Sequence, residues 1–402
     1  MSKTGIPSIR FRGFDDAWEQ RKLGDVVKEI TRNDPESEAP IMMITANNGF
    51  IEQSERYAFN NAGESLKKYI LLKKGELAYN HGASKLCPYG SCFALTTAEN
   101  ARIPFVYHCF SAENQNAEFM SIELNGAEIE NQLRKIVSSG ARMDGLLNIS
   151  FDEYTSVSVL LPGTEEQDRI ADFFRHLDNL ITLHQRKFEK LTNVKKSMLE
   201  KMFPKDGADI PEVRFKGFTD AWEQRKAKEL FVSTADKGYP ELPVLSATQD
   251  RGMISRDENS INIFHDKKNE AGYKRVLPGQ FVIHLRSFQG GFAHSAIEGI
   301  TSPAYTVFGF SEPEKHDSEY WKYVFTSKAF IRRLETVTYG IRDGRSISYD
   351  EFLTLSFVYP SRSEQTAIAQ YLDKLSNLIT LHQRELEKLR NIKKSMLKKM
   401  FV

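Results

Sequence analysis

The side chains of this chain best suited to chemistry are polar loop residues of the kinds that hydrogen-bond to the edges of nucleic-acid bases. Arginine, lysine, asparagine, glutamine and serine read such edges through donors and acceptors at fixed spacing. In the first half of the chain the candidates are Asn47, Asn48, Asn80, His81, Ser84, Lys85 and Arg142. In the second half they are Gln249, Arg251, His284, Arg286, Ser287, Gln289, Arg342 and Arg345. For each of them, a solvated loop side chain is an equally good interpretation.

No sequence pattern for catalysis accompanies these residues. The chain has no GxGxxG, GxxxxGK[ST], GxSxG or HExxH pattern. Residues 33–36, Asn-Asp-Pro-Glu, come nearest to a methyltransferase tetrapeptide but lack the aromatic residue that would stack on a flipped base. We therefore expect a binding protein and not an enzyme, with no catalytic residue, no metal and no cofactor of its own.

The cysteines and the chain's hydropathy indicate its compartment. Cys87, Cys92 and Cys109 are odd in number and widely spaced, which favours free thiols in a reducing environment over a disulfide framework. A zinc site with His81 and His108 is the alternative, although no CxxC or HxxxH pair is present. No segment is long and apolar enough to span a bilayer or act as a signal region, so we expect a cytoplasmic protein without membrane contact.

The overall charge is close to neutral. The 55 Lys and Arg residues oppose 54 Asp and Glu residues, for a net charge of +1. A protein that holds DNA alone is usually more basic, because neutralising phosphates supplies much of the affinity. Three interpretations remain: no nucleic acid is bound, the basic residues are concentrated locally, or partner proteins help to hold the DNA.

An internal duplication organises the chain. Residues 9–22 and 213–226 share 11 of 14 positions at an offset of 204. Residues 161–203 and 359–401 match at an offset of 198, with LITLHQR and KKSML unchanged. The two regions between these blocks differ strongly, and the change of offset from 204 to 198 makes the first about six residues longer. We predict a variable domain at 1–160, a helix at 161–203, a second domain at 204–358 and a second helix at 359–402.

Each repeated block predicts a long helix. Apolar residues recur at steps of three and four over about five heptads, with charges on the outer faces, which is typical of a coiled coil. The partner of each helix is expected to be its own copy. We call the residues facing the partner helix the seam. The predicted seam consists of Ile170, Phe174, Leu177, Ile181, His184, Leu191, Met198, Ile368, Leu372, Leu375, Ile379, His382, Leu389 and Met396.

Charge favours an antiparallel pair with a pseudo-two-fold axis. The second half of each helix is rich in Lys and Arg, so a parallel pair would bring two basic segments together. An antiparallel pair sets them near the acidic residues Glu165, Glu166, Asp168, Asp172 and Asp178. His184 and His382 would then lie near the midpoint. We favour polar seam residues that fix the register over a pH switch.

The variable regions predict α+β domains. Short β-rich runs occur at 40–44, 76–79 and 156–161 in the first region. In the second they occur at 243–245, 280–283, 306–310 and 355–358. Helical segments are expected at 128–137 and 320–336. The phrases Lys-Gly-Glu-Leu at 74–77 and Pro-Gly-Gln-Phe at 278–281 indicate a turn that enters a strand.

The order of these parts resembles the specificity subunits of type I restriction–modification systems. The resemblance covers the whole chain. It rests on the F-x-G-F-x-D-A-W-E-Q-R-K segments, the paired LITLHQR helices and the I-S-[FY]-D-E-[FY] close of each variable region. It implies two target-recognition domains that each read one half of an asymmetric bipartite DNA site, and a helical pair that sets the spacer between the halves.

The same resemblance implies partners. Two modification subunits carrying S-adenosylmethionine would dock on the helices and methylate adenine. Restriction subunits using ATP and Mg would add translocation and cleavage of double-stranded DNA. This chain would be a non-catalytic specificity subunit. The alternatives are a coiled-coil scaffold that does not bind DNA, a fused restriction–methylation enzyme, and a helix pair used for self-dimerisation.

Overall fold

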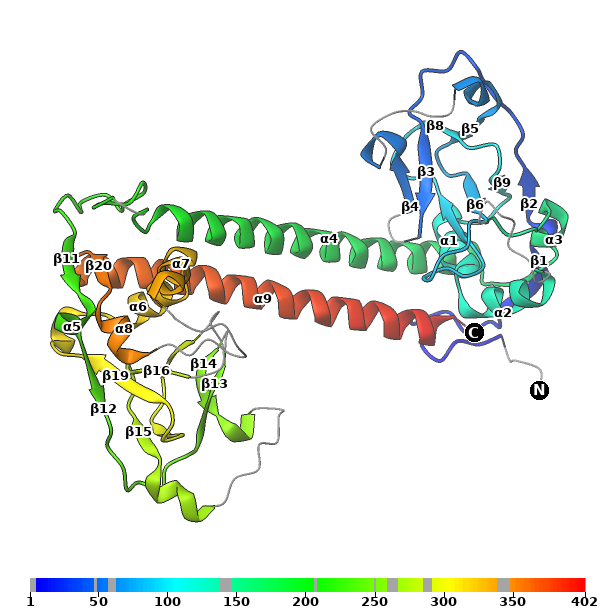
Figure 1. Ribbon diagram of the computed structural model, residues 1–402. Helices are drawn as coiled ribbons and strands as arrows, with labels where there is room; N and C mark the ends of the chain where they lie inside the picture. The colour runs from blue at the N-terminus through cyan, green and yellow to red at the C-terminus, as the bar shows by residue number, and fades with distance from the viewer. Residues whose placement is uncertain are drawn as a thin grey trace. The chain divides into compact units, whose positions relative to one another are not determined.

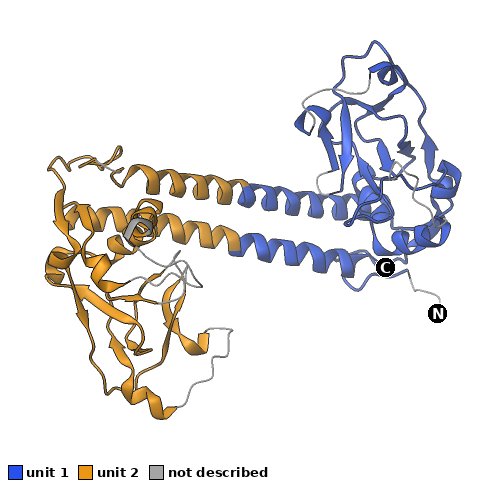
Figure 2. Ribbon diagram, viewed as in Figure 1, with its two compact units in different colours: residues 1–185, 384–402 blue, residues 186–383 orange. Residues whose placement is uncertain are grey.

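The computed structural model describes residues 5–46, 49–56, 63–137, 146–205, 208–248, 251–258, 267–284, 291–337 and 348–401. The chain forms two compact units (Figure 2): unit 1 is Met1–Gln185 with Arg384–Val402, and unit 2 is Arg186–Gln383. The long helices α4 (Thr164–Lys201) and α9 (Arg362–Met400) each contribute to both units. Each unit therefore holds one variable region, the start of the helix that follows it and the end of the other long helix.

Unit 1 is a set of small antiparallel sheets with short helices (Figure 1). Its strands are β1 (Glu19–Lys22), β2 (Val27–Glu29), β3 (Met42–Thr45), β4 (Gly49–Glu52), β5 (Ile70–Lys73), β6 (Leu77–Asn80), β7 (Ser91–Ala94), β8 (Asn100–Ile103), β9 (His108–Ala112) and β10 (Ser158–Leu161). Its short helices are α1 (Ala117–Leu124), α2 (Ala127–Ile136) and α3 (Phe151–Thr155). Three 3-10 turns are η1 (Leu23–Asp25), η2 (Gln53–Glu55) and η3 (Gly63–Lys68).

Unit 2 repeats this plan. Its strands are β11 (Glu223–Lys226), β12 (Phe231–Thr234), β13 (Leu245–Thr248), β14 (Gly252–Ser255), β15 (Lys274–Val276), β16 (Phe281–Ile283), β17 (Phe292–His294), β18 (Gly299–Thr301), β19 (Thr306–Phe310) and β20 (Ser356–Tyr359). Its short helices are α5 (Ala227–Leu230), α6 (Ser318–Phe325), α7 (Lys328–Val337) and α8 (Tyr349–Leu353), with 3-10 turns η4 (Arg256–Glu258), η5 (Lys267–Gly272) and η6 (Pro313–Lys315).

The two variable regions pair their strands in the same way. Unit 1 has a sheet in the order β2-β9-β6-β7 with the pairs β1-β10, β3-β4 and β5-β8. Unit 2 has β12-β19-β16-β17 with β11-β20, β13-β14 and β15-β18. The duplication therefore extends through regions whose sequences diverge, and the predicted α+β class is confirmed.

Strand register locates the extra length of the first region. Leu77 opposes Ala94 between β6 and β7, whereas Phe281 opposes His294 between β16 and β17. The two connections therefore span 94 − 77 = 17 and 294 − 281 = 13 positions, a difference of four. The remaining two residues lie between β7 and β8. The loop that follows β6, which contains Ser84 and Lys85, is thus the main place where the two domains differ in length.

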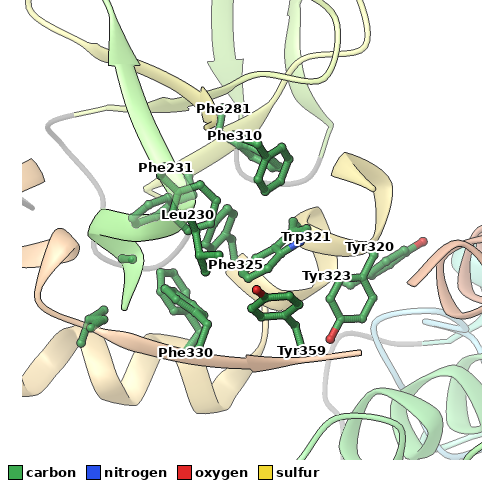
Figure 3. Packing of buried hydrophobic residues seen from close by; sticks show 14 of the residues in the cluster. Leu230, Phe231, Phe281, Phe310, Tyr320, Trp321, Tyr323, Phe325, Phe330 and Tyr359 are labelled. Carbon is green, nitrogen blue, oxygen red and sulfur yellow. The ribbon is translucent and has the colours of Figure 1, made fainter. Parts of the chain in front are cut away.

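Each variable region has two apolar cores. The core beside the long helices contains Trp18, Phe119 and Phe174 in unit 1 and Trp222, Trp321 and Leu372 in unit 2. Figure 3 shows Trp321 of unit 2 among Phe231, Phe325 and Tyr359. A second core lies under the β3–β4 hairpin in unit 1 and under the β13–β14 hairpin in unit 2. We call the part built on this second core the distal lobe.

The long helices pair antiparallel, as predicted. In unit 1, Met400 at the end of α9 joins the core that holds Ile170 and Phe174 near the start of α4. Lys393 Nζ lies 2.6 Å from Asp178 Oδ1, and Arg390 donates to Gln185 Oε1 at 3.0 Å. Residue numbers therefore rise along α4 as they fall along α9, which makes the pair antiparallel. In unit 2, Met202 at the end of α4 joins the core that holds Ile368 and Leu372.

Two local expectations need correction. The single helix predicted at 320–336 is two helices, α6 and α7, because the chain turns at Thr326 and the Ser327 hydroxyl accepts a hydrogen bond from the Phe330 N–H at the start of α7. The acidic residues at the start of α4 were expected to face the basic end of α9. Asp178 does, but Glu166 bonds Arg10 and Asp168 bonds Asn116, both in the variable region.

Candidate nucleic-acid interface

The β3–β4 and β13–β14 hairpins share a frame and differ at their tips. Each has a threonine and a glycine four residues apart: Thr45 donates to Gly49 O at 3.3 Å, and Thr248 donates to Gly252 O at 2.8 Å. Three residues lie between them, Ala-Asn-Asn in the first hairpin and Gln-Asp-Arg in the second. A fixed frame that carries variable polar residues is the arrangement expected of an element that reads sequence.

Glycine is required in both frames. Gly49 has φ 63° and Gly252 has φ 69°, a left-handed conformation that other residues adopt at a cost. A Cβ on Gly252 would lie 2.2 Å from the carbonyl oxygen of His294, and one on Gly49 would lie 3.1 Å from the Phe93 ring. These glycines let each hairpin approach the neighbouring sheet at the residue where the tip ends.

Arg251 is the hairpin candidate that the structure describes. Its side chain is exposed, and its backbone N–H donates to Thr248 Oγ1 at 3.1 Å, which fixes the chain at the turn. Asn47, Asn48 and Gln249 of the two tips lie outside the described residues, as do Arg142, Arg286, Ser287, Gln289, Arg342 and Arg345. Their assignment stays a prediction.

Asn80 and His81 are engaged inside the first domain. The Asn80 amide donates to Ile44 O at 3.2 Å and its Oδ1 accepts from the Gly82 N–H at 2.9 Å. His81 is buried, with Nδ1 2.8 Å from Leu147 O and Nε2 2.7 Å from Val106 O. Both ring nitrogens of His81 are thus occupied by carbonyl oxygens, and the half-buried Asn80 amide is partly used by backbone groups. We therefore leave both out of the interface proposed below.

The loop after β6 places Ser84 and Lys85 at an exposed turn. The turn is closed by the Ser84 N–H, which donates to Cys87 O at 3.1 Å, and by the Cys87 N–H, which donates to Ser84 Oγ at 3.0 Å. Leu86 at the tip of this turn is 67% exposed. In unit 2, His284 follows β16 at the position equivalent to Asn80 and is half-buried, with its ring 6.1 Å from Tyr305.

Two of the three thiols of the first domain are buried. Cys92 and Cys109 are buried free cysteines. Burial raises the pKa of Cys92 to about 12, and it raises the pKa of Cys109 as well, so both thiols stay protonated and unreactive at neutral pH. Among the described residues, no group of three His, Cys, Asp or Glu side chains is placed to hold a metal ion.

The junction between each variable region and its long helix is built twice from equivalent residues. Arg10 Nε and Nη2 donate to Glu166 at 2.8 and 2.6 Å, and Arg214 makes the same two bonds to Glu364 at 2.8 and 2.6 Å. The next residue of each helix, Gln167 or Gln365, is fully buried. Each donates to a proline carbonyl at 2.9 Å and accepts a backbone N–H, that of Asn116 or Asp317.

An aromatic clamp holds the end of the other long helix. Phe401 lies 5.7 Å from Phe119 and 5.9 Å from Trp18, measured between ring centroids. Phe203 stacks on Tyr320 at 5.5 Å, with Trp222 6.5 Å from Tyr320. The two tryptophans are buried. The domains are therefore fixed to the helices largely by the repeated segments.

Burial along the long helices falls from their starts toward the middle. Ile170, Phe174 and Leu177 are buried, and so are their counterparts Ile368, Leu372 and Leu375. The remaining seam residues are half-buried: Ile181, His184, Leu191, Met198, Ile379, His382, Leu389 and Met396. Leu183 and Leu381 near the helix midpoints are exposed at 46% and 52%. Sequence periodicity alone did not separate the buried positions from the half-buried ones.

Comparison with known proteins supports the resemblance. No protein-family model matches the chain. The specificity subunit of the type I restriction enzyme MjaVIII from Methanocaldococcus jannaschii is 26% identical over 278 residues, and this match spans 65% of each protein. A crystal structure of the S subunit of a type I restriction–modification system from M. genitalium aligns over 99% of both chains, with a TM-score of 0.58 and 13% identity. The resemblance is thus confirmed by a relative in sequence and by a solved structure in fold.

Proposed function

We propose that this chain is the DNA-recognition subunit of a type I restriction–modification complex. The proposal rests on the Thr–Gly frame that the two hairpins share and on the different residues between threonine and glycine. Two domains of the same topology therefore carry different polar residues at equivalent hairpins. Two domains of this kind would recognise two different half-sites of the DNA. The relative from M. jannaschii is named as such a subunit, which agrees with this function.

In this proposal the reading surface lies on the distal lobes and the loops after β6 and β16. Arg251, Ser84 and Lys85 are its described members, and Asn47, Asn48 and Gln249 complete the hairpin tips. Asparagine and glutamine pair with adenine, and arginine pairs with guanine, in the major groove. The domains correspond to residues 1–160 and 204–358. The helices of 161–203 and 359–402 would set the number of unread base pairs between the half-sites.

The chain would work with partners and hold no cofactor itself. Two modification subunits would supply S-adenosylmethionine and methylate adenine, and restriction subunits would supply ATP-driven translocation and cleavage. The net charge of +1 fits this division of labour, because partner subunits can neutralise phosphates that the recognition subunit does not. Such a complex would act on DNA in the cytoplasm.

The decisive experiment co-expresses the chain with its modification subunits and maps methylated adenines across a genome. A split asymmetric motif is expected. Replacing residues 28–160 with those of a related chain should change one half of the motif and leave the other half unchanged. If the whole motif changed, or if neither half did, the domains would not be independent readers. A scaffold that does not touch DNA predicts no methylation pattern that follows this chain and no salt-dependent DNA affinity.

A further inference from the structure

The contacts between each domain and its long helix contain a second set of residues that does not repeat. Helices α1 and α6 occupy equivalent places, and their N-cap residues are Asn116 and Asp317. In unit 1, Asn116 Nδ2 donates to Asp168 Oδ1 at 2.7 Å. In unit 2, Thr366 Oγ1 donates to Asp317 Oδ2 at 2.5 Å. The acid is on the helix in one unit and on the domain in the other.

A second divergent contact lies two turns further along each long helix. In unit 1, Arg175 Nη1 lies 3.3 Å from both carboxylate oxygens of Glu118. The equivalent helix position in unit 2 is Asp373, which accepts bonds from Lys322 Nζ at 2.7 Å and from the Tyr323 hydroxyl at 2.6 Å. The helix supplies the positive charge in unit 1 and the negative charge in unit 2.

We propose that these pairs form a matching code that assigns each domain to its own helix. If the second domain were placed on α4, the Asp317 carboxylate would face Asp168. If the first domain were placed on α9, Glu118 would face Asp373. Unit 2 avoids the second clash because Lys322 bonds both Glu319 and Asp373, whereas Ser121 occupies the equivalent position in unit 1. Each exchange therefore sets two carboxylates against each other, which is unfavourable at neutral pH.

The code is separate from the shared attachment. The Arg10–Glu166 and Arg214–Glu364 pairs are the same in both units, and each buried glutamine binds an equivalent proline carbonyl and an equivalent backbone N–H, so these contacts accept either domain. The helix residues that distinguish one domain from the other are those at positions 168, 175, 366 and 373. Exchange of recognition domains between the two places would succeed when the start of the matching helix, residues 164–175 or 362–373, travels with the domain.

Point variants of the full chain test the code. Thr366→Asp places a carboxylate opposite Asp317 and should lower the Tm by roughly 2–6 °C. The double variant D317N/T366D reproduces the Asn–Asp pair of unit 1 and should recover the loss, because asparagine caps a helix as well as aspartate does. Asn377→Asp, at an exposed position of the same helix, adds the same charge as a control and should leave the Tm within about 1 °C.

A domain exchange extends the test to both units. In one chain, residues 1–160 and 204–358 change places. In a second chain, the same exchange is combined with D168T, R175D, T366D and D373R. The second chain should unfold at a higher temperature than the first. The proposal is overturned if T366D behaves like the Asn377 control, if D317N does not rescue it, or if the four substitutions do not stabilise the exchanged chain. None of these readouts depends on DNA binding, so they stand apart from the proposed function.

Discussion

The guanidinium of Arg10 and the carboxylate of Glu166 form a two-pronged ion pair, 2.8 and 2.6 Å long, at the point where the first domain meets α4. The two residues lie 156 positions apart in the sequence, and their side chains are 11% and 2% exposed. The hydrogen bond to Glu166 raises the pKa of Arg10, which therefore stays charged. Arg214 and Glu364 repeat the arrangement in unit 2.

Breaking this pair should destabilise unit 1 strongly. Glu166→Gln leaves a buried guanidinium without its counter-charge, and we expect a loss of about 3 kcal/mol in the free energy of unfolding. Glu99→Gln is the control, because its exposed pair with Lys74 should contribute less than about 1 kcal/mol. Thermal and urea unfolding of both variants measure the difference. Equal losses would show that the buried pair is no stronger than a surface contact.

The end of each long helix should stabilise the domain that its helix does not follow: the end of α9 packs in unit 1, and the end of α4 packs in unit 2. Met400 is 3% exposed in the core of unit 1, and Met202 is 1% exposed in that of unit 2. Met400→Ala should cost about 2–4 kcal/mol and speed hydrogen exchange in the β1–β10 pair, while Met202→Ala should do the same in β11–β20. Lys399→Ala, at an exposed position, is the control. Loss of protection in the opposite domain would contradict the assignment of helix ends to units.

The pairing of the helices could be predicted from sequence, but the charge pattern explains their direction only in part: Lys393 bonds Asp178 as expected. The repeated apolar pattern and the identical LITLHQR segments indicate two helices that match each other. Charge was expected to select the antiparallel direction, yet Glu166 and Asp168 bind the domain. The direction follows instead from the apolar ends, since Met400 and Met202 enter cores built at the starts of the helices.

The proposed reading surface was less accessible to sequence analysis. Asn80 was predicted as a polar loop residue, but its amide donates to the Ile44 carbonyl. His81 was proposed on the same ground and is buried between two carbonyl oxygens. The hairpin frame of Thr45 and Gly49 escaped notice because a threonine and a glycine four residues apart are common in any sequence. Only strand pairing shows that Thr248 and Gly252 repeat it.

Stability of unit 2 should depend on pH through His316. This side chain is 5% exposed and stacks on Phe310 at 4.8 Å, and burial lowers its pKa to about 4. An unfolded histidine has a pKa of about 6.5, so between pH 6.5 and 4 the unfolded state takes up a proton that the folded state does not. The stabilisation is therefore complete above pH 6.5 and is lost as the pH falls toward 4.

The variant His316→Gln isolates this contribution, because glutamine occupies the equivalent position 115 in unit 1. Between pH 7 and 4.5 the parent should lose about 2 kcal/mol more stability than the variant. His176→Gln, at an exposed position on α4, serves as the control and should follow the parent. Parallel stability curves for the parent and His316→Gln would exclude a role for His316 in acid unfolding.

Arg251 should discriminate one base pair of the half-site read by the second domain. A bidentate contact between arginine and guanine is worth about 1–3 kcal/mol against other bases. Arg251→Ala should therefore weaken binding by this amount and relax the methylation motif at a single position. Arg251→Lys separates the two ways in which a cation can act: a phosphate contact would largely survive the change, whereas a fork-shaped contact to a base would not. Uniform weakening across all positions of the motif, with a smaller salt dependence, would reassign Arg251 to the DNA backbone.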